Sequence, residues 1–234
     1  IAREYDLFII SDEVYANVSF GDEPFVPIYD LIGDDVPACV MRGLSKEIPW
    51  PGARCGWIEF HNRHADPVFA EYVTSLFNAK MLQVCATTLP QRVIPKLFND
   101  DRYPAHLQSR ADLYKRRALE AYTAFRKIPG LTAPKPDGAL YFSVVFQDNI
   151  LNNEQSLELA GKVKTFVEDK VAGVSADKRF VYYLMAKTGI CVVPLSGFNS
   201  DLFGFRMTLL EPDDEKFTKL LTTITGTIAT YLKS

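Results

Sequence analysis

The 234-residue sequence lacks any long hydrophobic run and any excess of charge of one sign. Its longest clean apolar stretches, Leu7–Ile10 and Gly189–Pro194, are far shorter than the roughly 18 to 20 residues of a bilayer span. The 26 Lys+Arg and 29 Asp+Glu residues are interspersed and give a formal net charge of -3. These absences predict a protein without membrane spans and without the basic surface that binds nucleic acid or anionic lipid. Small molecules and other proteins remain as partners.

Cysteine and histidine are also scarce. The cysteines are Cys39, Cys55, Cys85 and Cys191, and the histidines are His61, His64 and His106. No CxxC spacing and no nearby pair of histidines completes a zinc site. We therefore predict reduced cysteines in a cytoplasmic protein, no metal site, and surface roles for the histidines.

The chain begins Ile-Ala-Arg-Glu-Tyr-Asp, without Met, and continues directly into an apolar strand at Leu7–Ser11. A strand that is apolar at every position needs neighbours on both edges and cover on both faces. We therefore expect that upstream sequence is missing.

Short apolar segments and helical periodicities alternate along the chain, which predicts an α/β fold. Before Gly130 the expected strands are Leu7–Ser11, Ala38–Leu44 and Cys55–Phe60, and the expected helices are Pro67–Lys80, Pro90–Phe98 and Pro104–Lys127. After Gly130 the expected strands are Ala139–Phe146, Gly189–Val193 and Gly204–Leu210, and the expected helices are Ser156–Asp169, Asp177–Thr188 and Asp213–Leu232. We predict two domains, an incomplete larger one over residues 1–102 and a smaller α+β one over 103–234 that begins with a long linking helix. On that helix the apolar stripe leaves Arg117 on the exposed side.

Three polar motifs stand out against this background. Asp12 and Tyr15 follow the first strand, at the end of a sheet strand where α/β proteins bind ligands. Taken alone, this motif is more typical of a loop with surface carboxylates. Lys46 follows the second strand, and Arg54 lies eight residues later, between a Pro-Gly turn and the third strand; a Lys in a loop is the alternative. Arg206 interrupts an apolar strand, where it needs either an internal carboxylate or a ligand carboxylate.

Together these motifs resemble the class I/II aminotransferases, which depend on pyridoxal 5′-phosphate and have fold type I. Ser-Asp-Glu-Val-Tyr resembles the family's strand-end Asp-x-x-Tyr, and Ser-Lys with Pro-Gly-x-Arg-x-Gly resembles its lysine box. Phe-Arg-Met-Thr resembles its substrate-arginine strand. The resemblance extends over essentially the whole chain, and Thr-Gly-Ile-Cys-Val-Val-Pro is most similar to alanine aminotransferases.

The resemblance implies a role for each matching residue. Lys46 is expected to form the Schiff base with pyridoxal phosphate and to move a proton during catalysis. Asp12 is expected to pair with the pyridine nitrogen and Tyr15 to hydrogen-bond the ring oxygen. Arg54 and Ser45 are expected to hold the phosphate. In the small domain, Arg206 is expected to bind the substrate carboxylate in bidentate fashion.

The sequence also departs from the family pattern. Gly43 stands where many members have a phosphate-binding Ser, and the family's glycine/serine-rich phosphate loop, ring-stacking aromatic residue and Asn-Pro segment are absent. Without them the sheet would expose an edge and an apolar face. We therefore expect that this stretch alone is not a competent transaminase.

The resemblance implies an amino acid and a 2-oxo acid as substrates and a homodimer as the full-length assembly. Residues 78–88 contain no Arg of the kind that dicarboxylate-specific members use, so we expect alanine or another neutral amino acid as donor, with 2-oxoglutarate as acceptor. Two alternatives share the same fold: a pyridoxal phosphate-dependent β-lyase, and a non-catalytic aminotransferase-like effector domain of a transcription regulator.

Overall fold

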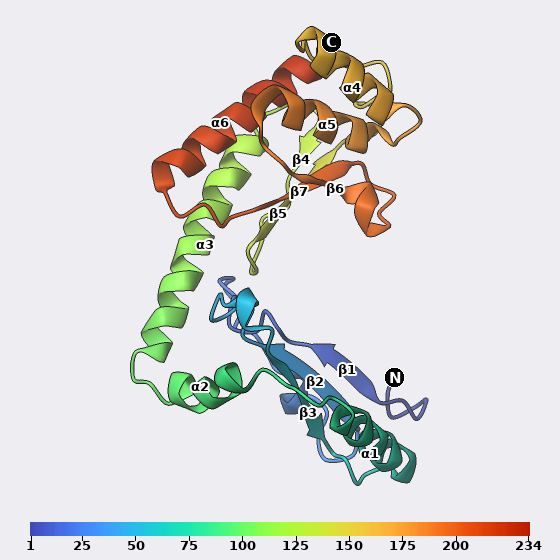
Figure 1. Ribbon diagram of the computed structural model, residues 1–234, viewed down its shortest axis with the longest axis vertical. Coiled ribbons are helices and arrows are strands. Elements are labelled where there is room, and N and C mark those ends of the chain that lie inside the picture. The colour runs from blue at the N-terminus through green and yellow to red at the C-terminus, as the bar shows by residue number, and fades with distance from the viewer. The chain divides into compact units, whose positions relative to one another are not determined.

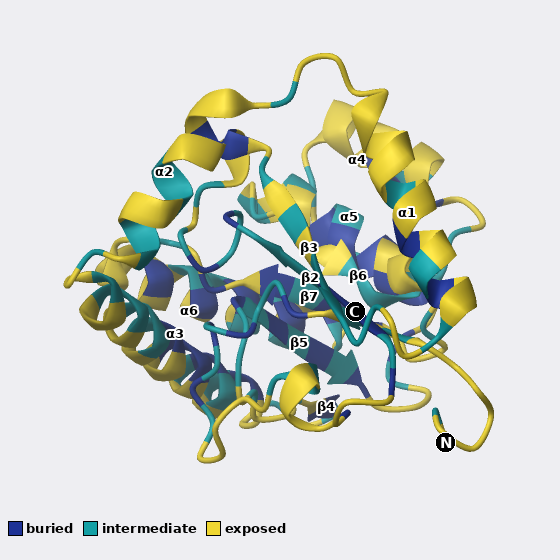
Figure 2. Ribbon diagram, turned by 90° about the horizontal axis from the view of Figure 1, so that it is seen from below, coloured by how far each residue is buried: buried dark blue, intermediate teal, exposed yellow.

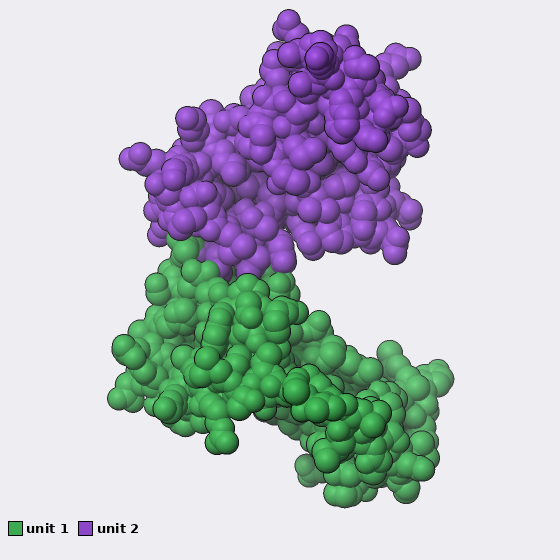
Figure 3. Space-filling model, in the orientation of Figure 1, with its two compact units in different colours: residues 1–113, 137–139 green, residues 114–136, 140–234 purple.

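The computed structural model describes residues 1–234, which divide into two compact units (Figure 3). Unit 1 contains residues 1–113 and 137–139, and unit 2 contains residues 114–136 and 140–234. Each unit combines a sheet with helices, which confirms the predicted α/β class. No helix is long and apolar enough to cross a membrane. The expected domain boundary at residue 102/103 stays a prediction, since helix α3 (Tyr103–Phe125) contributes residues to both units.

Unit 1 contains a three-stranded mixed sheet in the order β1-β2-β3 (Figure 1). Strand β1 (Ile9–Asp12) runs parallel to β2 (Ala38–Gly43), and β3 (Gly56–His61) runs antiparallel to β2. Successive side chains of β2 face opposite sides of the sheet, as the strand period requires. Ala38 packs with residues of the segment 28–36, whereas Cys39 packs against helix α1 (Pro67–Met81). The central strand is therefore covered on both faces.

Strand β1 exposes an edge and apolar side chains, as the sequence led us to expect of this sheet. It lies at the edge of the sheet, and Leu7, Phe8 and Ile10 are 53%, 44% and 57% exposed. No segment of the chain pairs with the free edge of β1, and only alternate residues of the strand meet the core. Large apolar side chains therefore lie at an unpaired strand edge. This is the exposed apolar surface that we expected from the absence of the family's phosphate loop and Asn-Pro segment.

The remaining elements of unit 1 lie between these strands or follow β3. They are η1 (Ile28–Asp30), η2 (Pro51–Ala53) and α2 (Thr88–Phe98). Helix α1 begins at Pro67 because the Asp66 side chain accepts a hydrogen bond from the amide of Phe69 at 2.6 Å and Pro is well tolerated in a first turn. Both α1 and α2 show mostly exposed residues (Figure 2).

Unit 2 contains a four-stranded antiparallel sheet in the order β4-β5-β7-β6. The strands are β4 (Leu131–Thr132), β5 (Tyr141–Phe146), β6 (Val193–Pro194) and β7 (Gly204–Thr208). The other elements are α4 (Gly161–Val171), α5 (Ala176–Thr188), η3 (Leu195–Phe198) and α6 (Asp214–Tyr231). Helices α5 and α6 lie within one residue of their expected bounds, whereas α4 begins five residues after the expected Ser156. The strand expected over 189–193 overlaps β6 only at Val193, and β4 was not predicted.

Aromatic rings dominate the core of unit 2. Phe142 and Phe146 of β5 and Phe205 of β7 are buried on one face of the sheet. They pack against Phe125 of α3 and Phe180 of α5 with ring centroids 5.2 to 5.8 Å apart. Since strand side chains alternate, Arg206 lies on the opposite face of β7 from this core.

Arg117 corrects the sequence-based assignment of an exposed residue. It is 1% exposed. Its guanidinium donates hydrogen bonds to the carbonyl oxygen of Leu209 and to Asp214, both at 3.0 Å, and lies over the Phe217 ring. The hydrogen bonds from Arg117 and, after it, from Arg116 hold the pKa of Asp214 below its usual range. The spacing of apolar residues assigned Arg117 to the polar side of α3. Such spacing cannot show that a second helix, α6, packs against that side.

Candidate active site

The expected cofactor residues of unit 1 lie at one edge of its sheet. Strands β1 and β2 are parallel, so their carboxyl ends meet at the same edge, with Asp12 opposite Met41 in register. The amide of Glu13 extends this pairing by donating to the carbonyl oxygen of Met41 at 3.0 Å. Lys46 follows β2 by three residues. The backbone therefore brings the segments of Asp12 and Lys46 together, at the edge where open α/β sheets bind ligands.

Lys46 lies beside Tyr15. Its side chain is half-buried, and its Nζ is 5.3 Å from the centroid of the Tyr15 ring. An amine over the face of a phenol ring gains a cation–π interaction and is partly shielded from water. Lys46 is therefore positioned in the fold and is not a freely solvated loop lysine.

The two neighbouring acids after β1 have different environments. Asp12 is exposed, and its carboxylate accepts a long hydrogen bond from the amide of Val14 at 3.3 Å. Glu13 is buried, where it accepts hydrogen bonds from Arg42 at 3.0 Å and from the amide of Ile28 at 2.8 Å. Glu13 is therefore structural, whereas the carboxylate of Asp12 retains capacity for a ligand.

Ser45 and Arg54 lie near the two ends of the loop that joins β2 to β3. The loop closes through a hydrogen bond from the amide of Leu44 to the carbonyl oxygen of Cys55 at 3.2 Å, and Ser45 is half-buried within it. Arg54 is exposed and has left-handed backbone angles, with φ of 47°, a conformation that non-glycine residues adopt rarely. Its guanidinium donates to the carbonyl oxygen of Pro51 at 2.8 Å, which leaves further N–H groups for an anion.

The packing of β2 against β3 explains why residue 43 is a glycine. It pairs with Gly56 at the end of the β2–β3 ladder, and an added Cβ would lie 3.2 Å from the carbonyl oxygen of Cys55. Two glycines in register allow the strands to approach closely there. A Ser at this position would press on the backbone of the neighbouring strand.

Arg206 belongs to unit 2 and contacts aromatic rings. Its guanidinium carbon lies 4.2 Å from the ring centroid of Tyr141 and 4.0 Å from that of Phe198. No Asp or Glu of unit 2 forms an ion pair with it. The structure thus contains no internal carboxylate of the kind that one alternative required, and stacking leaves the N–H edge of the guanidinium suited to a carboxylate ligand.

Asp177 fixes the segment that carries Phe198, and the sequence did not single it out. The side chain is completely buried and accepts hydrogen bonds from the amide and hydroxyl of Ser196 at 2.9 and 2.8 Å. It also accepts from Ser175 at 2.7 Å and from the amide of Lys178 at 2.7 Å. All these donors are neutral, and the first turn of α5 adds a favourable dipole. The start of a helical pattern was the only sequence signal.

His106 is also placed differently from the expected surface role. It is half-buried, and its Nε2 lies 3.1 Å from the carbonyl oxygen of Glu47. The sequence could not show this because the two residues are 59 positions apart.

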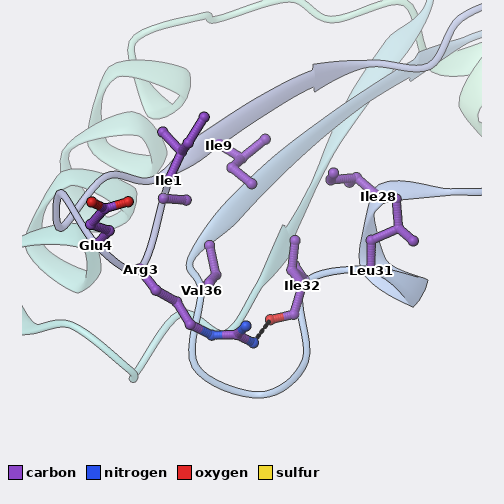
Figure 4. A pocket seen from close by; sticks show the side chains of 9 residues that line it. Ile1, Arg3, Glu4, Ile9, Ile28, Leu31, Ile32 and Val36 are labelled. Atoms are coloured by element: carbon purple, nitrogen blue, oxygen red, sulfur yellow. Dashed lines mark hydrogen bonds between the residues drawn. The ribbon is translucent and has the colours of Figure 1, made fainter.

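A separate cavity of about 340 Å³ lies in unit 1 (Figure 4). Apolar side chains, including Ile9, Ile32 and Val36, line most of it, and Arg3 donates a hydrogen bond to the carbonyl oxygen of Ile32 at its rim. None of the candidate site residues lines this cavity. This cavity is therefore not part of the candidate active site.

Comparison with known proteins identifies the family. The model of the family "Aminotransferase class I and II" matches residues 1–224. An uncharacterized aminotransferase from Methanocaldococcus jannaschii is 46% identical over 235 residues, which cover 100% of this chain and 54% of that protein. Among solved structures, alanine aminotransferase from Pyrococcus furiosus has a TM-score of 0.76 at 23% identity, over 97% of this chain and 51% of its own. Tyrosine aminotransferase from Leishmania infantum has a TM-score of 0.76 at 15% identity, over 98% and 50%.

The chain thus spans about half the length of the relatives that it matches. Its mixed α/β architecture is consistent with the C-terminal part of fold type I, as the motifs predicted. The resemblance noted in the sequence is confirmed by the family match over nearly the whole chain. This chain belongs to the class I and II aminotransferase family.

Proposed function

We propose that this chain carries the cofactor lysine and the substrate arginine of a pyridoxal phosphate-dependent aminotransferase. The observation that carries the proposal is the half-buried Lys46 amine, 5.3 Å from the Tyr15 ring at the carboxyl edge of β1 and β2. Family membership supplies the reaction class. The β-lyase and the non-catalytic effector domain remain the alternatives, and no contact in either unit favours them.

The donor set in unit 1 fits pyridoxal phosphate. When bound, the cofactor supplies an aldehyde and an electron-withdrawing ring, which stabilises negative charge at the substrate Cα. Asp12 would hold a proton on the ring nitrogen, and Tyr15 would donate to the ring oxygen. Arg54, together with Ser45, would bind the phosphate, for which a planar guanidinium is well suited. Lys46 would attach the cofactor and move the proton.

Arg206 is the residue that we expect to select amino acids over simple amines. The change Arg206→Lys keeps the charge and loses the planar two-pronged donor, so we expect KM for the amino acid to rise by about 10- to 100-fold. A primary amine without a carboxylate should be used equally by both proteins. Steady-state kinetics on the complete protein that carries this chain measures the difference. A similar KM rise for both substrates would contradict the proposed role, and Arg116→Lys, an exposed change on α3, serves as the control.

We propose a neutral amino acid, alanine foremost, as donor and 2-oxoglutarate as acceptor. The segment 78–88 contains no Arg to pair with a second substrate carboxylate. A panel of alanine, aspartate, tyrosine and leucine, with 2-oxoglutarate present, tests this choice, and we expect alanine to have the highest kcat/KM. A preference for aspartate would overturn it, and pyruvate with ammonia in the absence of an acceptor would indicate a lyase.

We further propose that the working enzyme is a cytoplasmic homodimer and that residues 1–234 alone do not sustain turnover. Four free cysteines fit a reducing compartment. The exposed apolar side chains along β1 and the length of the relatives support the second point.

A further inference from the structure

Glu47 follows Lys46 directly and differs from it in environment. Its side chain is buried, with 7% of its surface exposed, whereas Lys46 is half-buried and directed at Tyr15. A carboxylate buried in a protein is costly unless its oxygens accept hydrogen bonds. The hydrogen-bond partners of Glu47 therefore indicate the role of its side chain.

Both carboxylate oxygens of Glu47 are occupied. Asn17 Nδ2 donates to Oε2 at 2.6 Å, and the Tyr103 hydroxyl donates to Oε1 at 2.9 Å. The carbonyl oxygen of the same residue lies 3.1 Å from His106 Nε2, which the Nε2-protonated tautomer satisfies. Hydrogen bonds to a charged acceptor are short and about twice as strong as neutral ones. We call this arrangement of Glu47, Asn17, Tyr103 and His106 the Glu47 clamp.

The Glu47 clamp joins three segments that are far apart in the sequence. Asn17 lies two residues after Tyr15, in the turn that follows β1. Tyr103 and His106 lie in the first turn of α3. Burial, and after it the charge of Glu47, raises the pKa of Tyr103, so its hydroxyl stays protonated as a donor. The clamp thus fastens the backbone beside Lys46 to the turn of Tyr15 and to a long helix.

We propose that Glu47 is a positioning residue for Lys46. Its carboxylate ties the Lys46 segment to the Tyr15 turn through Asn17, and this tie holds the amine beside the phenol ring. The proposal rests on the proposed function for the chemistry of Lys46, whereas the positioning itself is a property of the polypeptide without cofactor.

The variant Glu47→Gln tests the clamp in the 234-residue chain. A glutamine amide cannot accept at both positions, so one donor loses its partner and the Lys46 segment becomes more mobile. We expect acetylation of Lys46 by limiting acetic anhydride to become about tenfold faster, the ratio that one charge-assisted hydrogen bond is worth. Peptide mass spectrometry reads every lysine separately, and the other lysines should keep their rates. Hydrogen exchange of the peptide over residues 44–50 should accelerate in parallel.

Glu168→Gln is the matched control. Glu168, in unit 2, also accepts a hydrogen bond from a tyrosine hydroxyl, that of Tyr183, and pairs with Arg179. Its loss should lower stability without changing Lys46. A Glu47→Gln protein with wild-type exchange over 44–50 and wild-type Lys46 acetylation overturns the proposal. If that variant does not fold, Tyr103→Phe, which deletes one donor, decides by the same two readouts.

A further arm separates this proposal from the proposed function. Pyridoxal phosphate and borohydride are added to the wild-type chain, and the labelled lysine is identified. Labelling elsewhere than Lys46 contradicts the proposed function and leaves the two cofactor-free readouts to decide the clamp. Labelling at Lys46 supports the proposed function, and the two cofactor-free readouts again decide the clamp.

Discussion

Lys46→Ala is expected to remove covalent attachment of pyridoxal phosphate and to lower transaminase activity of the complete protein by at least about a thousandfold. A positioned proton-transfer group alone contributes about 10²- to 10⁴-fold, and Lys46 is expected to supply both proton transfer and attachment. Borohydride reduction after addition of the cofactor, followed by peptide mapping, should find the adduct on Lys46 in the wild type and on no residue in the variant.

Lys96→Ala is the matched control, because Lys96 is an exposed lysine of α2 in the same unit. It should leave attachment and activity unchanged. Retained attachment in Lys46→Ala, or adducts spread over several surface lysines of the wild type, would show that Lys46 has no special reactivity and would remove the basis of the proposed function.

Gly204→Ala is expected to lower the free energy of unfolding of the chain by at least about 3 kcal/mol, because it overfills a packed strand junction. Gly204 begins β7, and an added Cβ would overlap the carbonyl oxygen of Val144 and lie 2.7 Å from the Leu195 side chain. The Val144 atom is backbone of the neighbouring strand and cannot rotate away. Urea denaturation followed by circular dichroism measures the change.

Gly226→Ala is the comparison. Gly226 is exposed within α6, and an added Cβ there has no atom within 4 Å. Since Ala is a better helix former, this variant should be about 0.5 to 1 kcal/mol more stable than the wild type. Equal stability of the two variants would mean that β7 does not approach β5 as closely as described.

Gly204→Ala should also affect Arg206. Because Arg206 lies two residues after Gly204, loss of the close contact between β7 and β5 should displace that arginine.

The elements with a strong periodic pattern could be predicted from the sequence. Helix α1 was expected over Pro67–Lys80 and extends over Pro67–Met81, because a Pro and a capping Asp define its start and its apolar spacing is regular. The short strand β4 carries no pattern of its own and exists because β5 offers it hydrogen bonds. An exposed edge and apolar face were expected for the sheet of β1, whereas the particular residues exposed, such as Ile10, depend on which neighbours the strand finds.

In the candidate site, too, some residues could be predicted from the sequence and others could not. Residues such as Asp12, Lys46 and Arg206 were found because charged groups at strand ends or inside apolar strands are unusual. Their supporting residues were missed. Glu47 and Asp177 look like ordinary acids in the sequence, and only the fold brings distant donors to their oxygens.

The setting of Arg206 has a consequence for how ligands could exchange. Rings from β5 and from η3, on either side of β7, hold the guanidinium in place of a resident counter-ion. A transaminase must release an oxo acid and then admit an amino acid, and both carry the same carboxylate. An arginine whose orientation is fixed by stacking can exchange one ligand carboxylate for another without first displacing an acidic side chain of the protein. On the proposed role of Arg206, exchange of these substrates would need no internal ion pair to break.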